Sequence, residues 1–228
     1  MHQKSCGRRR SGALLMWLGG ILMAAALGLA VYNAWDEYRA AAAANAVVVE
    51  LAQMTERPAK PQPSGASEPS APSVEEAAPS VTETPEELPD YVRYPEKVMP
   101  MSQVNGYDCL GIVEIPALER TLPVLESCTD GSLKIAPGCY SGSVYQKDMV
   151  IAGHNYTSHF AKLRSLKAGD PVYFTDLDGN RFCYEVADLE TLEPTDIEGM
   201  TTGDWDMTLF TCTYGNRHRL AVRCFLTD

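Results

Sequence analysis

The 228-residue chain has few basic residues and no closely spaced cysteine pair, and these two absences exclude whole classes of function. Lys and Arg number 19 against 30 Asp and Glu, so the formal net charge is −11. A nucleic-acid-binding surface needs clustered Lys and Arg, and this balance therefore argues against a nucleic-acid partner. No CxxC motif occurs, so the usual cysteine spacing of zinc sites is absent and we predict no metal site.

The seven cysteines do not decide the redox compartment. Six of them lie between residues 109 and 224, an even number that could form three disulfides. If one of the six is a catalytic thiol, the other five cannot all pair. The sequence predicts no cofactor, and it leaves open both a calcium requirement and the pairing of Cys109, Cys128, Cys139, Cys183 and Cys224.

Charge is absent from one long stretch near the N-terminus, residues 13–35. As a helix rising ~1.5 Å per residue, this stretch spans about 35 Å, more than the ~30 Å hydrocarbon core of a bilayer. The alternative is a cleaved signal peptide, but the apolar part of a signal peptide is usually only ~7 to 15 residues long. We therefore predict an uncleaved, single-pass transmembrane anchor.

The charges that flank this anchor predict its orientation. The basic cluster KSCGRRR at residues 4–10 precedes it, whereas Asp36 and Glu37 follow it. Positive charge favours the cytoplasmic side. We predict a cytoplasmic basic tail over residues 1–12, the anchor over 13–35 and all later residues outside the cell.

The part of the chain after the anchor divides into a stalk and one globular domain. Residues 36–90 are first rich in Ala and then in Pro, Ser and Glu, with too little apolar surface to offset the entropy of ordering the Pro-rich part. Prolines and like charges extend such a segment. Residues 91–228 suffice for a single core, and we predict that they form the functional domain.

Short β-prone runs, separated by Gly, Pro and Asp, dominate the domain. Residues 158–166 are the one stretch with apolar side chains at helical spacing. Strands this short and numerous predict an all-β fold, a closed barrel of about eight strands with one or two short helices. The predicted strands cover residues 110–115, 121–125, 149–155, 171–176, 181–192, 207–212 and 217–224.

A cysteine ends one of these runs, and an arginine-rich run follows it. If the two runs form a hairpin, Cys212 lies opposite Arg217 or, with a longer loop, opposite Arg219. Either guanidinium would favour the charged, nucleophilic thiolate and could donate to a developing oxyanion. The alternatives are a small buried thiol and solvated arginines, Arg223 included.

Cysteine catalysis also needs a proton partner, normally histidine. By strand alternation His218 faces the core together with Val222 and Cys224, and the arginines face outward. His154 ends a run expected to be buried on both faces, which would hold its imidazole rigidly. The alternative for His154 is a hydrogen-bonded structural histidine.

Two motifs resemble those of the sortases, the cysteine transpeptidases of Gram-positive bacteria. AGHN at residues 152–155 is similar to the family's histidine motif, and TLFTC at 208–212 matches its TLxTC motif completely. HRLAVRC at 218–224 resembles the family's last strand, in which the first arginine is catalytic. Together the similar segments cover about residues 104–226.

The resemblance implies a role for four residues. Cys212 would be the nucleophile, His154 the acid/base partner and Arg219 the transition-state stabiliser, with Arg217 kept as the alternative arginine. Thr211 would support the substrate and the oxyanion.

The resemblance also implies an activity and its partners. The enzyme would cleave an LPxTG-like C-terminal sorting signal of surface proteins through a thioacyl intermediate. It would then transfer the protein to an amine of a peptidoglycan precursor or, in a pilin-polymerising sortase, of a pilin. The alternatives are a cysteine hydrolase and a non-catalytic, stalked β-barrel adhesion module.

Overall fold

The computed structural model describes residues 8–55, 90–213, 215 and 217–227. Cys6 and the Pro-rich part of the predicted stalk lie outside the described residues. The elements, in chain order, are α1 Arg8–Thr55, α2 Asp90–Arg93, β1 Ser102–Val104, β2 Tyr107–Ile115, η1 Pro116–Leu118, β3 Arg120–Leu125, α3 Asp130–Leu133, β4 Gly138–Ser141, β5 Met149–Gly153, η2 Leu163–Ser165, β6 Pro171–Asp176, β7 Arg181–Leu192, α4 Ile197–Thr201, β8 Met207–Cys212 and β9 Arg219–Leu226.

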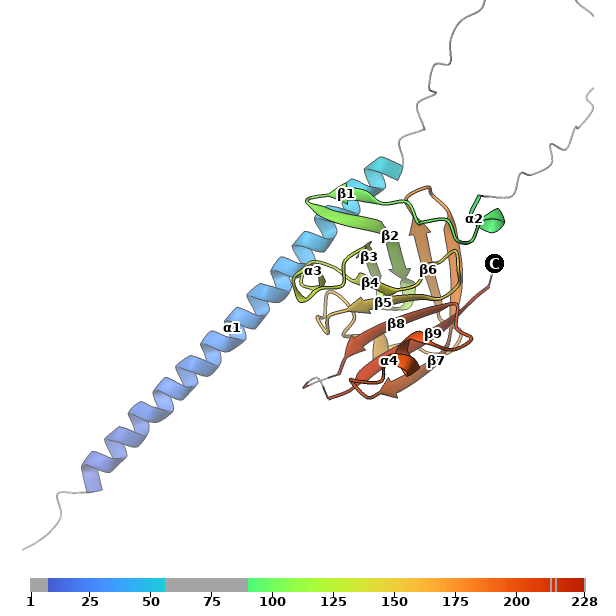
Figure 1. Ribbon diagram of the computed structural model, residues 1–228. Coiled ribbons are helices and arrows are strands. Elements are labelled where there is room, and N and C mark those ends of the chain that lie inside the picture. Colours follow the sequence, from blue (N-terminus) through green and yellow to red (C-terminus); the bar gives the residue numbers. More distant parts are fainter. Residues whose placement is uncertain (1–7, 56–89, 214, 216, 228) are drawn as a thin grey trace, which may run out of the picture.

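Eight strands close into a mixed barrel (Figure 1). Hydrogen bonding runs in the order β2-β3-β4-β5-β8-β9-β7-β6, and β6 pairs back onto β2. β1 extends the sheet outside this ring, as the partner of β2 alone. The β3–β4 and β5–β8 pairs are parallel, and the other pairs are antiparallel. The predicted closed barrel with few helices is confirmed.

The barrel interior is a single apolar core, in which Val113, Ile151, Leu209 and Val222 are completely buried. β5 is buried along its whole length, as its unbroken apolar sequence predicts. Its two faces are buried differently: one contributes to the core, and the other lies beneath the segment that joins β7 to β8. Because β5 is buried on both faces, its end is held in place, and so is the backbone of the residue that follows it.

The helical prediction for residues 158–166 is wrong in its extent. Only η2, a single 3₁₀ turn, forms there, although Phe160, Leu163 and Leu166 are buried as their spacing suggested. These side chains reach the core from a series of turns. Apolar spacing in a short segment therefore reflected burial here, and not a regular helix. The short strands β1 and β4 escaped prediction because neither has a distinct apolar run.

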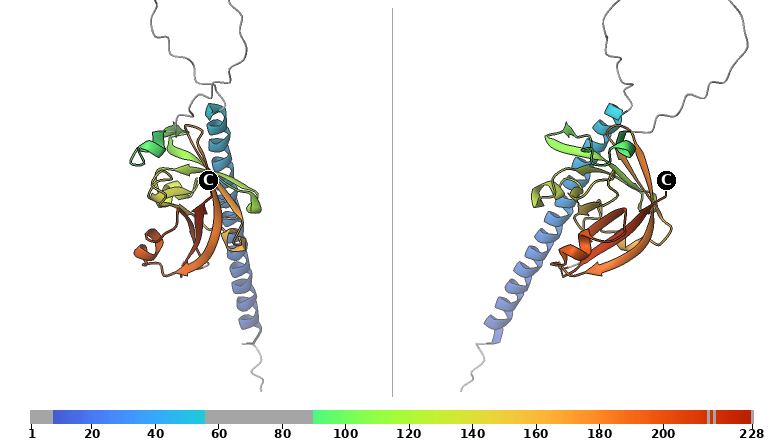
Figure 2. Two further views of the ribbon diagram at one scale, coloured as in Figure 1. Left: turned by 90° about the vertical axis from the view of Figure 1, so that its right-hand side faces the viewer. Right: turned by 45° about the vertical axis from the view of Figure 1, so that its right-hand side comes forward.

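Helix α1 packs along one side of the barrel with its C-terminal part, and its N-terminal part extends away from it (Figure 2). All residues from 14 to 35 are exposed. Ala40, Ala44, Val47 and Leu51 are buried and recur at helical spacing, so they form one face of α1. The Ala-rich start of the predicted stalk is thus helical, and it packs on the domain.

The exposed part of α1 has the composition of a membrane span. Among the described residues, one helix is long and apolar enough to cross a bilayer, judged by length and composition. The candidate region is Leu14–Gln53, and an 18-residue window within it has a mean hydropathy of 2.2. The predicted anchor over residues 13–35 falls at the start of this helix.

Candidate active site

The β8–β9 hairpin resolves the choice between the two arginines. Cys212 is paired with Arg219 across the antiparallel ladder. The loop is closed by Thr213, whose backbone N–H donates to the His218 carbonyl oxygen at 3.0 Å. Arg217 lies within the loop and is exposed. The longer of the two predicted loops is therefore present, and Arg219 is the arginine beside the thiol.

His154 reaches the same edge of the barrel from the neighbouring strand. β5 and β8 are parallel, and Gly153 is paired with Thr211. Since both strands run in the same direction, the residues that follow this pair, His154 and Cys212, emerge side by side. Parallel pairing thus brings together two residues that are far apart in the sequence.

Cys212, His154 and Arg219 line one open pocket. The segment after β3 and helix α3 form one wall, and the segment between β7 and β8 forms another. Apolar and acidic side chains complete the lining. The remaining lining residues are Cys128, Asp130, Leu133, Tyr140, Ala152, Gly153, Glu193, Pro194, Asp196, Ile197, Met200 and Phe210.

The sequence also matches a known domain, the sortase domain, over residues 113–227. The chain belongs to the sortase family. The resemblance predicted from the motifs is therefore confirmed, and the match includes His154, Cys212 and Arg219.

Two solved sortase structures illustrate the similarity. Sortase A from Corynebacterium diphtheriae shares 28% identity and a TM-score of 0.50, over 54% of this chain and 62% of that chain. Sortase C from Streptococcus pneumoniae shares 30% identity and a TM-score of 0.48, over 55% of this chain and 69% of that chain. The chain thus spans less than two thirds of the sortase A structure. No protein of curated function matches it.

Burial sets the electrostatics of His154 in this sortase. Removal from water disfavours the imidazolium and lowers the pKa of His154, while the charge of Asp130 opposes that shift. Nε2 of His154 is shielded from solvent and has no hydrogen-bond partner within the described part of the chain. An unpaired buried nitrogen is costly, and functional sites are where such atoms are expected.

The Thr211 side chain links the two strands that carry the candidate nucleophile and its histidine. Its side chain is buried, and its hydroxyl donates to the Gly153 carbonyl oxygen at 2.8 Å. This bond ties the end of β8 to the end of β5. Thr211 thereby fixes the strands that carry Cys212 and His154 relative to each other, and its support of substrate and oxyanion stays a prediction.

The prediction that His218 faces the core is wrong. β9 begins at Arg219, so His218 belongs to the loop and does not follow the strand alternation. Its side chain is 45% exposed, and Nδ1 lies 3.4 Å from Oε1 of Glu193. Val222 and Cys224 do point inward as predicted, and both are completely buried.

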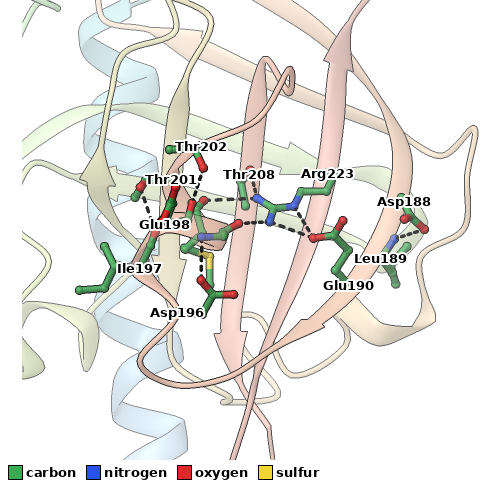
Figure 3. A network of polar contacts seen from close by, with 12 residues as sticks. Asp188, Leu189, Glu190, Asp196, Ile197, Glu198, Thr201, Thr202, Thr208 and Arg223 are labelled. Atoms are coloured by element: carbon green, nitrogen blue, oxygen red, sulfur yellow. Dashed lines mark hydrogen bonds and ion pairs between the residues drawn. The ribbon is translucent and has the colours of Figure 1, made fainter.

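The alternative of a solvated strand face is also wrong for Arg223, which is 1% exposed. It points out of the barrel, but the segment containing α4 covers it (Figure 3). Its guanidinium donates to Glu190 Oε2 at 3.0 and 3.2 Å, to Thr208 Oγ1 at 2.9 Å and to the carbonyl oxygens of Gly199 and Met200. Arg223 thus holds α4, and with it one wall of the pocket, against the barrel.

Several residues that line the pocket were not identified from the sequence. Cys128 and Asp130 lie on the segment after β3, which carries no chemical motif; its helix α3 begins with a capping box between Thr129 and Ser132. That pattern predicts a helix start but no function.

Within the described residues, no group of three or more His, Cys, Asp or Glu side chains could hold a metal ion. The six cysteines of the domain are free.

Proposed function

We propose that this sortase is a membrane-anchored cysteine transpeptidase on the outer face of a Gram-positive membrane. It cleaves an LPxTG-like sorting signal and transfers the protein to an amine of a cell-wall precursor. One observation carries the proposal: Cys212 is paired with Arg219, and His154 lines the same pocket. A nucleophile, an oxyanion donor and an acid/base group are what acyl transfer needs.

In the first half-reaction the Cys212 thiolate attacks the carbonyl carbon of the Thr–Gly bond, and an S–C bond forms. The His154 imidazolium then donates a proton to the leaving glycine nitrogen as the C–N bond breaks. The product is a thioester between Cys212 and the threonine carbonyl, with His154 neutral.

In the second half-reaction an acceptor amine attacks the thioester carbonyl. His154 removes a proton from the attacking nitrogen, the C–S bond breaks and the thiolate is restored. The new amide joins the surface protein to the acceptor. Attack on the thioester by an amine makes the enzyme a transpeptidase, whereas attack by water would make it a hydrolase.

Arg219 is suited to stabilise the tetrahedral intermediates of both steps. It enters the pocket directly opposite the nucleophile, and its Nη1 makes only a long contact of 3.5 Å with the His218 carbonyl oxygen. A guanidinium so placed can donate to the oxyanion that forms on the attacked carbonyl.

The test uses the full chain in detergent micelles, a library of LPxTG-like pentapeptides and a panel of amines that includes oligoglycine and a diaminopimelate-like amine. Mass spectrometry detects the thioester on Cys212 and the amide product. We expect both species with at least one peptide and amine pair. A pilin lysine peptide in the same panel distinguishes wall anchoring from pilin polymerisation.

Cys212→Ala is the matched control. It should abolish thioester and amide while leaving thermal unfolding nearly unchanged, because Cys212 is a half-buried residue at the end of a strand. Transfer that persists in Cys212→Ala contradicts the proposal. Cleavage without amide product, whichever amine is present, identifies a hydrolase instead.

A further inference from the structure

Helix α1 makes two polar contacts with the segment that follows His154. Oδ2 of Asp36 accepts a hydrogen bond from the Tyr156 hydroxyl at 2.9 Å, and Oε1 of Glu37 accepts one from the Thr157 backbone N–H at 2.6 Å. Asp36 and Glu37 directly follow the predicted membrane anchor. The end of the anchor therefore touches the barrel two and three residues beyond the candidate acid/base group.

Tyr156 connects this contact to the imidazole. Its ring packs against two histidine rings, with centroid distances of 5.1 Å to His154 and 5.4 Å to His159. One aromatic side chain thus packs against His154 with its ring and binds Asp36 with its hydroxyl. Since the Tyr156 ring is held at its far end, its contact with His154 is also held.

The helix is itself fixed on the barrel, so Asp36 is a stable partner. Val47 and Leu51 share an apolar cluster with Val104, Cys109 and Leu125, which come from β1, β2 and β3. Burial of the α1 face begins at Asp36 and continues to Leu51. The polar contact is therefore the membrane-proximal end of a continuous docking surface.

The charges around His154 come from three directions. Asp130 and Lys134 face it from α3 and the residue after it, Asp36 faces it from α1, and His159 lies beyond Tyr156 on the same segment. Burial lowers the pKa of His154, and the negative charges of Asp130 and Asp36 act against that shift. Removing Asp36 should therefore lower the pKa of His154 further.

We propose that Asp36 and Tyr156 are positioning residues for His154, through which the docked membrane helix holds the imidazole for acid/base catalysis. This inference rests on the proposed function, because it gives His154 the acid/base role. It adds that a residue outside the barrel contributes to the positioning of the candidate acid/base group. Asp36 and Tyr156 act through His154 and do not contact the substrate.

The experiment compares full-length wild type, Asp36→Ala, Tyr156→Phe and the double variant in detergent micelles, with the peptide and amine that wild type uses. We expect each single variant to lower kcat about tenfold while KM stays within about twofold, because the misplaced group acts after binding. The double variant should match the single variants, because all three break one contact. In Asp36→Ala, the limb of the pH profile due to His154 should move to lower pH.

Glu37→Gln is the matched control. It removes a neighbouring charge from the same helix and weakens a contact with the Thr157 backbone, but it leaves the bond between Asp36 and Tyr156 in place. We expect a near-wild-type kcat, and a pH profile in which the limb due to His154 does not move. If Asp36 only anchored the segment that follows His154, Glu37→Gln would lower kcat as much as Asp36→Ala does. That result would overturn the inference. So would wild-type kcat and pH profile in both Asp36→Ala and Tyr156→Phe.

An NMR titration separates this inference from the proposed function. The Cε1–H signal of His154, assigned by its loss in His154→Gln, is followed against pH in histidine-labelled protein. A lower pKa of His154 in Asp36→Ala than in wild type supports the inference even in a chain that transfers nothing. An unchanged pKa overturns it even if transfer is observed. Coincident thermal unfolding of the variants shows that the fold is intact.

Discussion

Cys212 and Arg219 are the last residue of β8 and the first residue of β9, and they face each other across the hairpin. The pairing places a permanent positive charge where acyl transfer would develop a negative one. Arg219→Ala should therefore lower kcat by about 100-fold to 1000-fold with little change in KM, the usual cost of losing one oxyanion donor. Steady-state kinetics with peptide and amine measure it.

Arg217→Ala is the control for this prediction. Arg217 lies in the same loop, has the same charge and is exposed. Its removal should leave kcat near the wild-type value. Equal losses in Arg217→Ala and Arg219→Ala would mean that general positive charge matters, and not the pairing with Cys212.

Gly153 allows Phe160 to pack against the backbone next to His154. A Cβ atom at this position would lie 2.4 and 2.7 Å from atoms of the Phe160 ring, closer than van der Waals contact allows. Gly153→Ala should destabilise the protein by about 1 to 3 kcal/mol through overpacking. Because Phe160 follows His154 closely, kcat should fall as well. Urea unfolding gives the free energy.

Gly131→Ala tests whether the effect belongs to this contact. Gly131 lies within helix α3, and an added Cβ would come no closer than 3.9 Å to another atom, Oγ1 of Thr129. Alanine is favoured over glycine in a helix. We expect Gly131→Ala to be neutral or slightly stabilising, and a destabilisation equal to that of Gly153→Ala would contradict the argument.

The buried guanidinium of Arg223 should be one of the most sensitive positions of the domain. Arg223→Met leaves the Glu190 carboxylate and the carbonyl oxygens of Gly199 and Met200 without their donor. Because Glu190 is 35% exposed and can be solvated, the cost comes mainly from the buried carbonyl oxygens, about 1 to 3 kcal/mol for each acceptor left unpaired. Amide hydrogen exchange should also show faster opening of α4, because Arg223 holds that helix on the barrel (Figure 3).

The surface pair of Arg181 and Glu114 provides the comparison. Arg181 donates two bonds of 3.0 Å to Glu114, but the two side chains are 46% and 32% exposed. Exposed pairs contribute at most about 1 kcal/mol. Arg181→Met should therefore cost far less than Arg223→Met in the same urea titration. Similar losses would mean that burial of Arg223 is not the cause.

His159 should make the fold sensitive to mild acid. It is completely buried, neither ring nitrogen has a hydrogen-bond partner among the described residues, and burial lowers its pKa to about 4. Because the unfolded chain binds the proton at about pH 6.5, stability is full above that pH and falls as the pH drops toward 4. The loss should reach about 3 kcal/mol.

His159→Gln measures this contribution, because glutamine has a similar volume and does not titrate in this range. The variant should lose about 3 kcal/mol less than wild type between pH 6.5 and pH 4 in urea unfolding. His218→Gln serves as control, since His218 is half exposed. An acid sensitivity that is unchanged in His159→Gln would show that another group causes it.

Much of this structure follows from local sequence patterns. β-prone runs between turn residues located seven of the nine strands, and the unbroken apolar sequence of β5 predicted its burial on both faces. The hairpin argument placed an arginine beside Cys212. Two registers were compatible with strand pairing, however. The family resemblance favoured Arg219, and the observed pairing of Cys212 with Arg219 has the longer of the two loops.

The parts that escaped prediction depend on contacts between distant segments. Arg223 belongs to an outward face by strand alternation, and it is buried because α4, more than 20 residues earlier, folds over it. Asp36 and Tyr156 are 120 residues apart, and neither carries a motif. Local patterns indicate which face of an element points outward, but they do not indicate what covers that face.

The docking of α1 has a consequence for how the enzyme would meet its substrates. Burial on the barrel begins at Asp36, one residue after the predicted anchor ends. With residues 13–35 in a bilayer, the barrel would stand directly on the lipid surface, at a height set by a rigid helix, whichever path residues 56–89 follow. The height of the active site above the membrane would then be fixed. A substrate protein would have to present its sorting signal at that height.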